Sequence, residues 1–250
     1  MPNRLSNFYF RALIALFLAF AGLQPVQAQT GEADFVGELV FGLTTNSNSG
    51  LLGGVMAKYS TVYDDKTSYF LQLEMVEVKH PKEWRYINEE TQSIFVLGKS
   101  NYLFAIRPMV GVERVLFRKA PDQGIHVNLI GAIGPTLGIL KPYLIYYDYT
   151  GGLRNDVRIE QYDPNKHNDP NNILGNAGFA TNFSDSKIDP GFNIRTGLTF
   201  EYGQFREVAA GIEVGFMYEQ FLNKLAIMPE ARKSSSYRSV YITLYGGWRR

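Results

Sequence analysis

Apolar and polar residues alternate along most of this chain with the two-residue period of a β-strand. The pattern is clear in residues 192–202 and again in 208–219, on either side of the short polar link 203–206. Two such segments predict a β-hairpin with one apolar and one polar face. If the apolar face lies inside, the hairpin belongs to a soluble barrel or sandwich. If it lies outside, the hairpin belongs to a membrane barrel with a polar interior.

The same alternation recurs along the chain and predicts an all-β protein of ten strands. The strands are expected over residues 35–44, 51–62, 68–78, 93–97, 102–117, 125–138, 143–149, 192–202, 208–219 and 238–248. The fourth and seventh are short, and the count is eight if neither belongs to the barrel. No long helix is predicted, because Pro229 interrupts the best helical candidate, residues 221–233.

The links between the predicted strands alternate between short and long. Short links cover residues 64–66, 98–101, 140–142 and 203–206, and longer ones cover 46–50, 79–92, 118–124, 150–190 and 222–237. Outer-membrane barrels have short periplasmic turns, long extracellular loops and an even number of strands. The sorting of the links therefore favours a transmembrane, antiparallel, up-and-down β-barrel with both termini in the periplasm over a secreted soluble barrel.

The polar faces of the predicted strands carry charges and glycines, which suits a narrow barrel interior. The apolar stripes are about 9–11 residues long, the length of a tilted membrane strand. The charged side chains are therefore expected inside, where they form an interlocked network that fills the bore. The predicted network consists of Glu38, Lys58, Glu74, Arg107, Glu113, Arg195, Glu201 and Glu213. Aromatic residues near the strand ends are expected to form girdles at the membrane interfaces; they are Tyr202, Phe205, Phe216, Tyr218, Tyr245 and Trp248.

The N-terminus has the pattern of a secretory signal peptide, residues 1–28. Arg4 and Arg11 precede an apolar segment at 12–23, and the small residues Val26 and Ala28 predict cleavage before residue 29. Residues 29–250 then form one barrel domain. The chain has no cysteine, which excludes disulfides and a lipoprotein anchor. The 25 basic and 24 acidic residues nearly balance, so no nucleic-acid partner is expected.

The signal peptide, the hairpin of residues 191–219 and the last strand, "SVYITLYGGW", resemble the small outer-membrane β-barrel proteins of Gram-negative bacteria, the OmpX-like class. The last strand of that class ends on an aromatic residue, whereas Arg249 and Arg250 follow Trp248 here. The resemblance implies an outer-membrane location, in contact with lipid and lipopolysaccharide. It specifies no activity, because the class contains structural, adhesive, enzymatic and transport proteins.

The sequence offers little chemistry for catalysis or for a metal ion. An outer-membrane lipid hydrolase needs a nucleophile, a base and an orienting group, and His126 has neither a serine nor an acid beside it. Asp163 and Asp169 lie in a polar stretch, 163–172, whose oxygen atoms suit Ca²⁺. The spacing matches no EF-hand and is typical of turns. We therefore predict no cofactor, no metal and no enzymatic activity.

The segment 150–190 is the predicted functional surface, because loops of this length are usually functional. Its apolar patch at 173–179 is expected either to cap the barrel mouth or to dock another envelope protein or an extracellular ligand. The candidate partner-binding residues are Trp84, Ile173, Leu174 and Phe179. The predicted function is a structural or binding component of the cell envelope. The alternatives are a lipid hydrolase, a narrow pore and a secreted soluble barrel.

Overall fold

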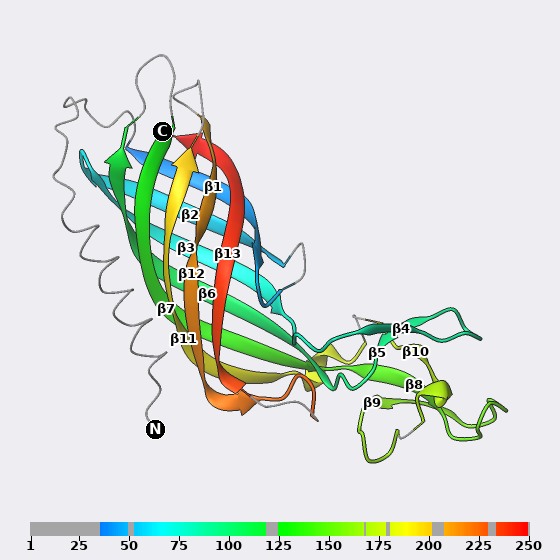
Figure 1. The fold of residues 1–250 in the computed structure, drawn as a ribbon. Helices are drawn as coiled ribbons and strands as arrows, with labels where there is room; N and C mark the ends of the chain where they lie inside the picture. The colour runs from blue at the N-terminus through cyan, green and yellow to red at the C-terminus, as the bar shows by residue number, and fades with distance from the viewer. Residues whose placement is uncertain are drawn as a thin grey trace, which may run out of the picture. The chain divides into compact units, whose positions relative to one another are not determined.

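Eight long antiparallel strands close into a barrel (Figure 1). The computed structural model describes residues 36–49, 53–118, 125–167, 169–178, 181–201, 208–229 and 234–249, so the predicted signal peptide lies outside it. The ring contains β1 (Gly37–Asn46), β2 (Gly54–Asp64), β3 (Thr67–Val78), β6 (Asn101–Phe117), β7 (His126–Pro142), β11 (Lys187–Glu201), β12 (Val208–Leu225) and β13 (Ser234–Arg249). Each barrel strand pairs with the next along the chain, and β1 pairs with β13. The predicted up-and-down β-barrel is confirmed.

The ring has eight strands, the lower of the two predicted counts. The predicted strands at 93–97 and 143–149 correspond to β5 (Ile94–Val96) and β8 (Leu144–Asp148). β5 pairs with β4 (Arg85–Ile87), and β8 pairs with β9 (Val157–Gln161) and β10 (Ile173–Asn176), in two separate small sheets. These strands are too short to cross a membrane, which takes a β-strand of about 9–11 residues.

The connections between barrel strands fall into two groups, one at each end of the barrel. Residues 65–66, 118–125 and 202–207 join strands at the end where β1 begins and β13 finishes, called the turn end. Residues 47–53, 79–100, 143–186 and 226–233 join them at the opposite end, called the loop end. Two of the predicted short links, 98–101 and 140–142, do not join barrel strands at the turn end, because β7 continues to Pro142 and β5 lies outside the ring. The predicted long link 118–124 lies at the turn end.

The longest connection also differs in its limits from the prediction. It spans 143–186, and the last residues of the predicted loop, 187–190, begin β11. Pro190 is exposed near the start of that strand, a position where proline is tolerated. From sequence, this proline is predicted to end the loop.

Side chains alternate between the two faces of every barrel strand. In β12, Glu213 is buried and the flanking Ile212 and Val214 are exposed; in β13, Thr243 is buried and Ile242 and Leu244 are exposed. The apolar face therefore lies outside and the polar face inside. No helix of the described residues is long and apolar enough to span a membrane.

The small sheets at the loop end have a core of their own. Phe95 of β5, Ile145 and Tyr147 of β8 and Ile173 of β10 pack together with Tyr143 and Tyr162. The backbone ties this assembly to the barrel rim: Ser100 and Asn101 donate to the carbonyl of Ile227, and Tyr143 donates to that of Ser100. We call β4, β5, β8, β9 and β10 with this core the loop assembly.

Candidate functional site

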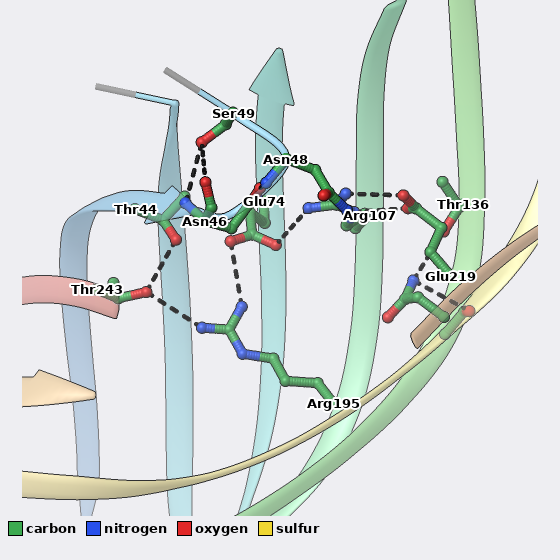
Figure 2. A network of polar contacts seen from close by, with 12 residues as sticks. Thr44, Asn46, Asn48, Ser49, Glu74, Arg107, Thr136, Arg195, Glu219 and Thr243 are labelled. Atoms are coloured by element: carbon green, nitrogen blue, oxygen red, sulfur yellow. Dashed lines mark hydrogen bonds and ion pairs between the residues drawn. The ribbon is translucent and has the colours of Figure 1, made fainter. Parts of the chain in front are cut away.

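Arg107 ties opposite walls of the barrel together. It lies on β6, and its Nε and Nη2 donate to the two carboxylate oxygens of Glu219 on β12, at 2.7 and 2.9 Å (Figure 2). Its Nη1 donates to Glu74 on β3, at 3.2 Å. Because β7 and β11 lie between β6 and β12 in the ring, the Arg107–Glu219 pair must cross the bore.

Arg195 on β11 makes a second crossing and shares a partner with Arg107. Its Nη1 donates to the other oxygen of Glu74, at 3.2 Å, and its Nη2 and Nε donate to Glu213, at 2.6 and 2.9 Å. Its Nη2 also donates to Thr243, whose hydroxyl donates to Thr44 (Figure 2). Two arginines therefore hold one carboxylate between them, a charge-assisted arrangement that is strong when it is enclosed.

A third group of charges lies in the half of the barrel nearer the turn end. The Lys58 ammonium on β2 is 3.1 Å from the Glu113 carboxylate on β6, and both side chains are buried. Asn128 and Thr199 also donate to Glu113. The ammonium lies 5.3 Å from the ring centre of Tyr245, within cation–π range.

A fourth group closes the ring where its first and last strands meet. Arg249 of β13 lies 2.6 Å from Glu38 of β1 and also pairs with Glu201 of β11. Tyr245 donates to Glu201, at 3.3 Å. Because β1 and β13 are far apart in the chain, this group fastens the closure of the barrel.

The structure brings all eight of the predicted interior charges into these groups. Two further members, Glu219 and Arg249, were not predicted. Glu219 has the same strand phase as Glu213, so the two-residue alternation alone was sufficient to place it inside. Arg249 has the phase of Thr243, but it lies one residue beyond the predicted last strand, 238–248.

One predicted girdle residue is corrected. Tyr245 is buried, with its hydroxyl bonded to Glu201, and so points into the barrel. Trp248 and Phe216 are exposed, as expected of girdle residues, and Tyr202 and Phe205 lie outside the described residues. Tyr245 shares the inward phase of Thr243, which decides its direction despite its aromatic ring.

Glycines on the inward face make room for the large interior side chains. A Cβ atom on Gly197 or Gly215 would lie 2.5 Å from the Tyr241 hydroxyl oxygen, closer than real Cβ contacts allow. The Tyr241 ring in turn covers Arg195, whose guanidinium carbon lies 3.7 Å from the ring centre. Glycine at these positions therefore allows the arginine to be enclosed.

The loop assembly is an ordered surface at the loop end. Asp148 fixes the turn between β8 and β9 by accepting bonds from the Thr150 hydroxyl and from the backbone N–H groups of Thr150, Gly152 and Arg154. These bonds, chiefly the one from the Thr150 hydroxyl, lower the pKa of the Asp148 carboxyl to about 2. The carboxylate is therefore charged, and the turn is held, at any physiological pH.

The four predicted partner-binding residues have different surroundings. Trp84 is 72% exposed and lines a cleft of about 660 Å³ with Tyr86 and His167. Ile173 is fully buried in the loop core, so it cannot contact a partner as predicted. Leu174 is half-buried, and Phe179 lies outside the described residues. Within this apolar run, Ile173 therefore supplies packing for the loop assembly.

The histidines lie in ordinary structural surroundings. His126 is opposite Glu201 in the pairing of β7 with β11, and this carboxylate is distant from His126 in sequence. Glu201 is already bonded to Arg249 and Tyr245. His167 is buried, and its Nδ1 accepts from the backbone of Asp163.

The carboxylates of the possible calcium site accept hydrogen bonds within turns. Asp163 accepts from the backbone N–H of Asn165, and Asp169 accepts from that of Asn171. Both contacts are typical of Asx turns. In the part of the chain that the structure describes, no group of three or more acidic or histidine side chains is placed to hold a metal ion.

Comparisons with known proteins give a weak likeness. No family model and no curated protein matches the chain. Three similar solved structures are Ail, the attachment invasion locus protein of Yersinia pestis (11% identity, TM-score 0.42), Neisserial surface protein A (9%, 0.42) and the N-terminal β-barrel domain of Pseudomonas aeruginosa OprF (9%, 0.35). The matches cover 87%, 88% and 88% of this chain and 100% of each of those chains. A likeness of this size does not extend the neighbours' activities to this protein.

Proposed function

We propose that this protein is a non-enzymatic outer-membrane β-barrel that displays the loop assembly outside the cell, as a structural or binding component of the envelope. The observation that carries the proposal is the apolar outward face of the barrel. Large apolar side chains are exposed on all eight strands, among them Phe41, Tyr59, Leu71, Val110, Ile133, Ile194, Ile212 and Leu244. Soluble monomers rarely expose a continuous apolar surface of that extent.

The height of this surface suits a bilayer. In β13 the outward residues from Val240 to Trp248 carry no charge, and at about 3.4 Å per residue with a tilt near 40° they rise about 20 Å. In β7 the uncharged outward run from Val127 to Ile139 is longer and rises about 30 Å on the same basis. Lipid-facing bands of bacterial barrels are about 25 Å tall. The exposed charged residues Arg114, Lys224 and Arg238 lie near strand ends.

The asymmetry of the connections supports an orientation. Outer-membrane barrels keep short turns in the periplasm and long loops outside the cell. By this rule the turn end, with both ends of the described barrel, faces the periplasm, and the loop assembly faces the medium. Cleavage of the predicted signal peptide and contact with lipid and lipopolysaccharide belong to the same proposal.

A narrow pore is the transport alternative, and the interior disfavours it. The Arg107–Glu219, Arg195–Glu74 and Lys58–Glu113 pairs join strands that are not neighbours and so occupy the bore. In an eight-stranded barrel, side chains largely fill the interior. Planar-bilayer recording is expected to show no steady conductance.

A lipid hydrolase is the enzymatic alternative, with His126 as the base. Its cross-strand neighbour Glu201 already binds Arg249 and Tyr245, so the orienting carboxylate of a catalytic triad is engaged elsewhere. His126→Ala is expected to leave the lipid composition of expressing cells unchanged. Altered acylation of the lipid that depends on His126 would favour the enzyme.

The membrane barrel itself is tested by extraction and gel migration. The full chain should sediment with outer membranes, require detergent for solubility, and migrate differently on a gel before and after boiling. A chain that stays soluble without detergent contradicts the proposal. Protease treatment of intact cells should cut only in the connections at the loop end. A pull-down in mild detergent then identifies any envelope partner.

A further inference from the structure

Strand β9 is an open sheet edge in the loop assembly. Within the described residues its only strand neighbour is β8, and the opposite edge of this sheet, β10, contacts β5. Asn176 of β10 donates to the carbonyl of Ile94, which helps to cover that edge. An uncovered edge carries backbone donors and acceptors that can pair with another strand.

The register identifies the free backbone groups of β9. Tyr149 donates to the carbonyl of Asp156, and Tyr162 donates to that of Tyr143. Hydrogen-bonded pairs alternate along an antiparallel ladder, so Arg158 and Glu160 direct their backbone groups to β8. The backbone groups of Val157, Ile159 and Gln161 therefore point away from the sheet.

The sequence of β9, "VRIEQ", is complementary to itself in the antiparallel direction. When two copies pair about a two-fold axis at Ile159, the Ile159 residues face each other and Val157 faces Gln161 of the other copy. Arg158 of each copy then faces Glu160 of the other. In this register the backbone groups of Val157, Ile159 and Gln161 form the hydrogen bonds between the two copies. These are the same three residues whose backbone groups point away from the sheet.

The side chains needed for this pairing are accessible. Ile159 is 51% exposed and Val157 39%. The Arg158 side chain is 62% exposed and the Glu160 side chain 27% exposed. Tyr146, opposite Ile159 on β8, is 37% exposed, so the apolar face continues onto the next strand.

We propose that β9 is a homotypic interface, at which two copies of this chain join their three-stranded sheets into one six-stranded sheet. The contact is isologous and closes after two copies, as a two-fold axis requires. A five-residue edge is much smaller than a standard protein interface. The association is therefore weak in dilute detergent and is favoured where copies are crowded together.

Cysteine cross-linking of the full chain tests this register, because the natural chain has no cysteine. The Cα atoms of two facing Ile159 residues are expected about 5.5 Å apart. In concentrated detergent solution, Ile159→Cys should form a covalent dimer with a short thiol cross-linker. Ile87→Cys is the matched control, because this isoleucine is also exposed but lies on β4.

A second pair of variants distinguishes the register from random collision. Val157 should lie about 14 Å from its own copy across the axis, so Val157→Cys alone should not cross-link, whereas a mixture of Val157→Cys and Gln161→Cys chains should. Within the Ile159→Cys chain, Arg158→Glu or Glu160→Arg should lower the cross-linking rate about three- to tenfold, because like charges then face each other twice. The two changes together should restore the rate.

Ile159→Cys cross-linking no faster than Ile87→Cys overturns the proposal, and so does equal self-cross-linking of Val157→Cys. The same samples report the fold separately, because boiling still shifts the migration of an intact barrel. If the barrel is folded but β9 does not cross-link, this interface is refuted. The proposed envelope function is not affected by that result.

Discussion

Replacement of Arg195 by methionine tests whether the barrel interior is a closed, interlocked network. Arg195 is buried, and it is the cation seen paired with Glu213 in the described residues. Glu74 keeps its bond to Arg107 when Arg195 is lost, but Glu213 loses its ion pair. Removing one member of a buried pair costs about 3–5 kcal/mol. We expect a loss of this size in the free energy of unfolding.

The measurement is urea unfolding of the barrel in lipid vesicles, followed by tryptophan fluorescence in a Trp84→Phe background, so that Trp248 on the outer face is the reporter. Arg158→Met is the matched control. Its guanidinium pairs with Asp156 in the exposed loop assembly, and such pairs contribute at most about 1 kcal/mol. The double variant Arg195→Met/Glu213→Gln should recover part of the loss, because no unpaired charge remains.

A closed, interlocked interior is refuted if Arg195→Met lowers the free energy of unfolding no more than Arg158→Met does. That result would mean that water reaches and screens the interior charges, as in an open channel. A conductance through the wild-type barrel would then be expected as well.

Three further predictions concern the outer face, the interior packing and the loop assembly. Ile194→Arg places a charge at an exposed position in the middle of β11 and should cost about 2–4 kcal/mol in vesicles; a smaller effect in bilayers than in detergent would be contrary to a lipid-facing position. Gly197→Ala should destabilise the barrel by about 1–3 kcal/mol through the clash with Tyr241, and Tyr241→Phe should relieve part of it. The folded-state pKa of Asp148 is lowered to about 2, so its contribution to turn stability is present above its ordinary pKa and lost only as the pH falls through about 2; NMR titration of the Gly152 amide should show that midpoint, and a midpoint near 4 would contradict the hydrogen-bonded carboxylate.

Strand alternation predicted which side chains share a face, because a two-residue period fixes the direction of each side chain once one position is known. The sorting of the links then predicted that the polar face is inside. Together they placed Arg195 and Glu213 correctly. The same alternation rule places Glu219, Arg249 and Tyr245 inside, because each has the phase of an inward residue of its strand.

The number of strands could not be decided from local pattern. The segments of β5 and β8 have strand-like sequences, but they pair with β4, β9 and β10 inside the loops and not with barrel strands. Pairing is a non-local property, and it decides which short strand enters the ring. For the same reason the burial of Ile173 was missed, since its neighbours Phe95 and Tyr143 come from two different loops.

The apolar outer face of the barrel is expected to contact lipid, and the loop assembly is expected to contact water. Single cysteines at Ile242 and Ile87, each carrying a nitroxide spin label in vesicles, test both contacts directly. The label at Ile242 is expected to collide with lipid-soluble oxygen and to be shielded from a water-soluble nickel complex, and the label at Ile87 is expected to show the opposite. Free access of the nickel complex to the label at Ile242 would mean that the outer face does not contact lipid.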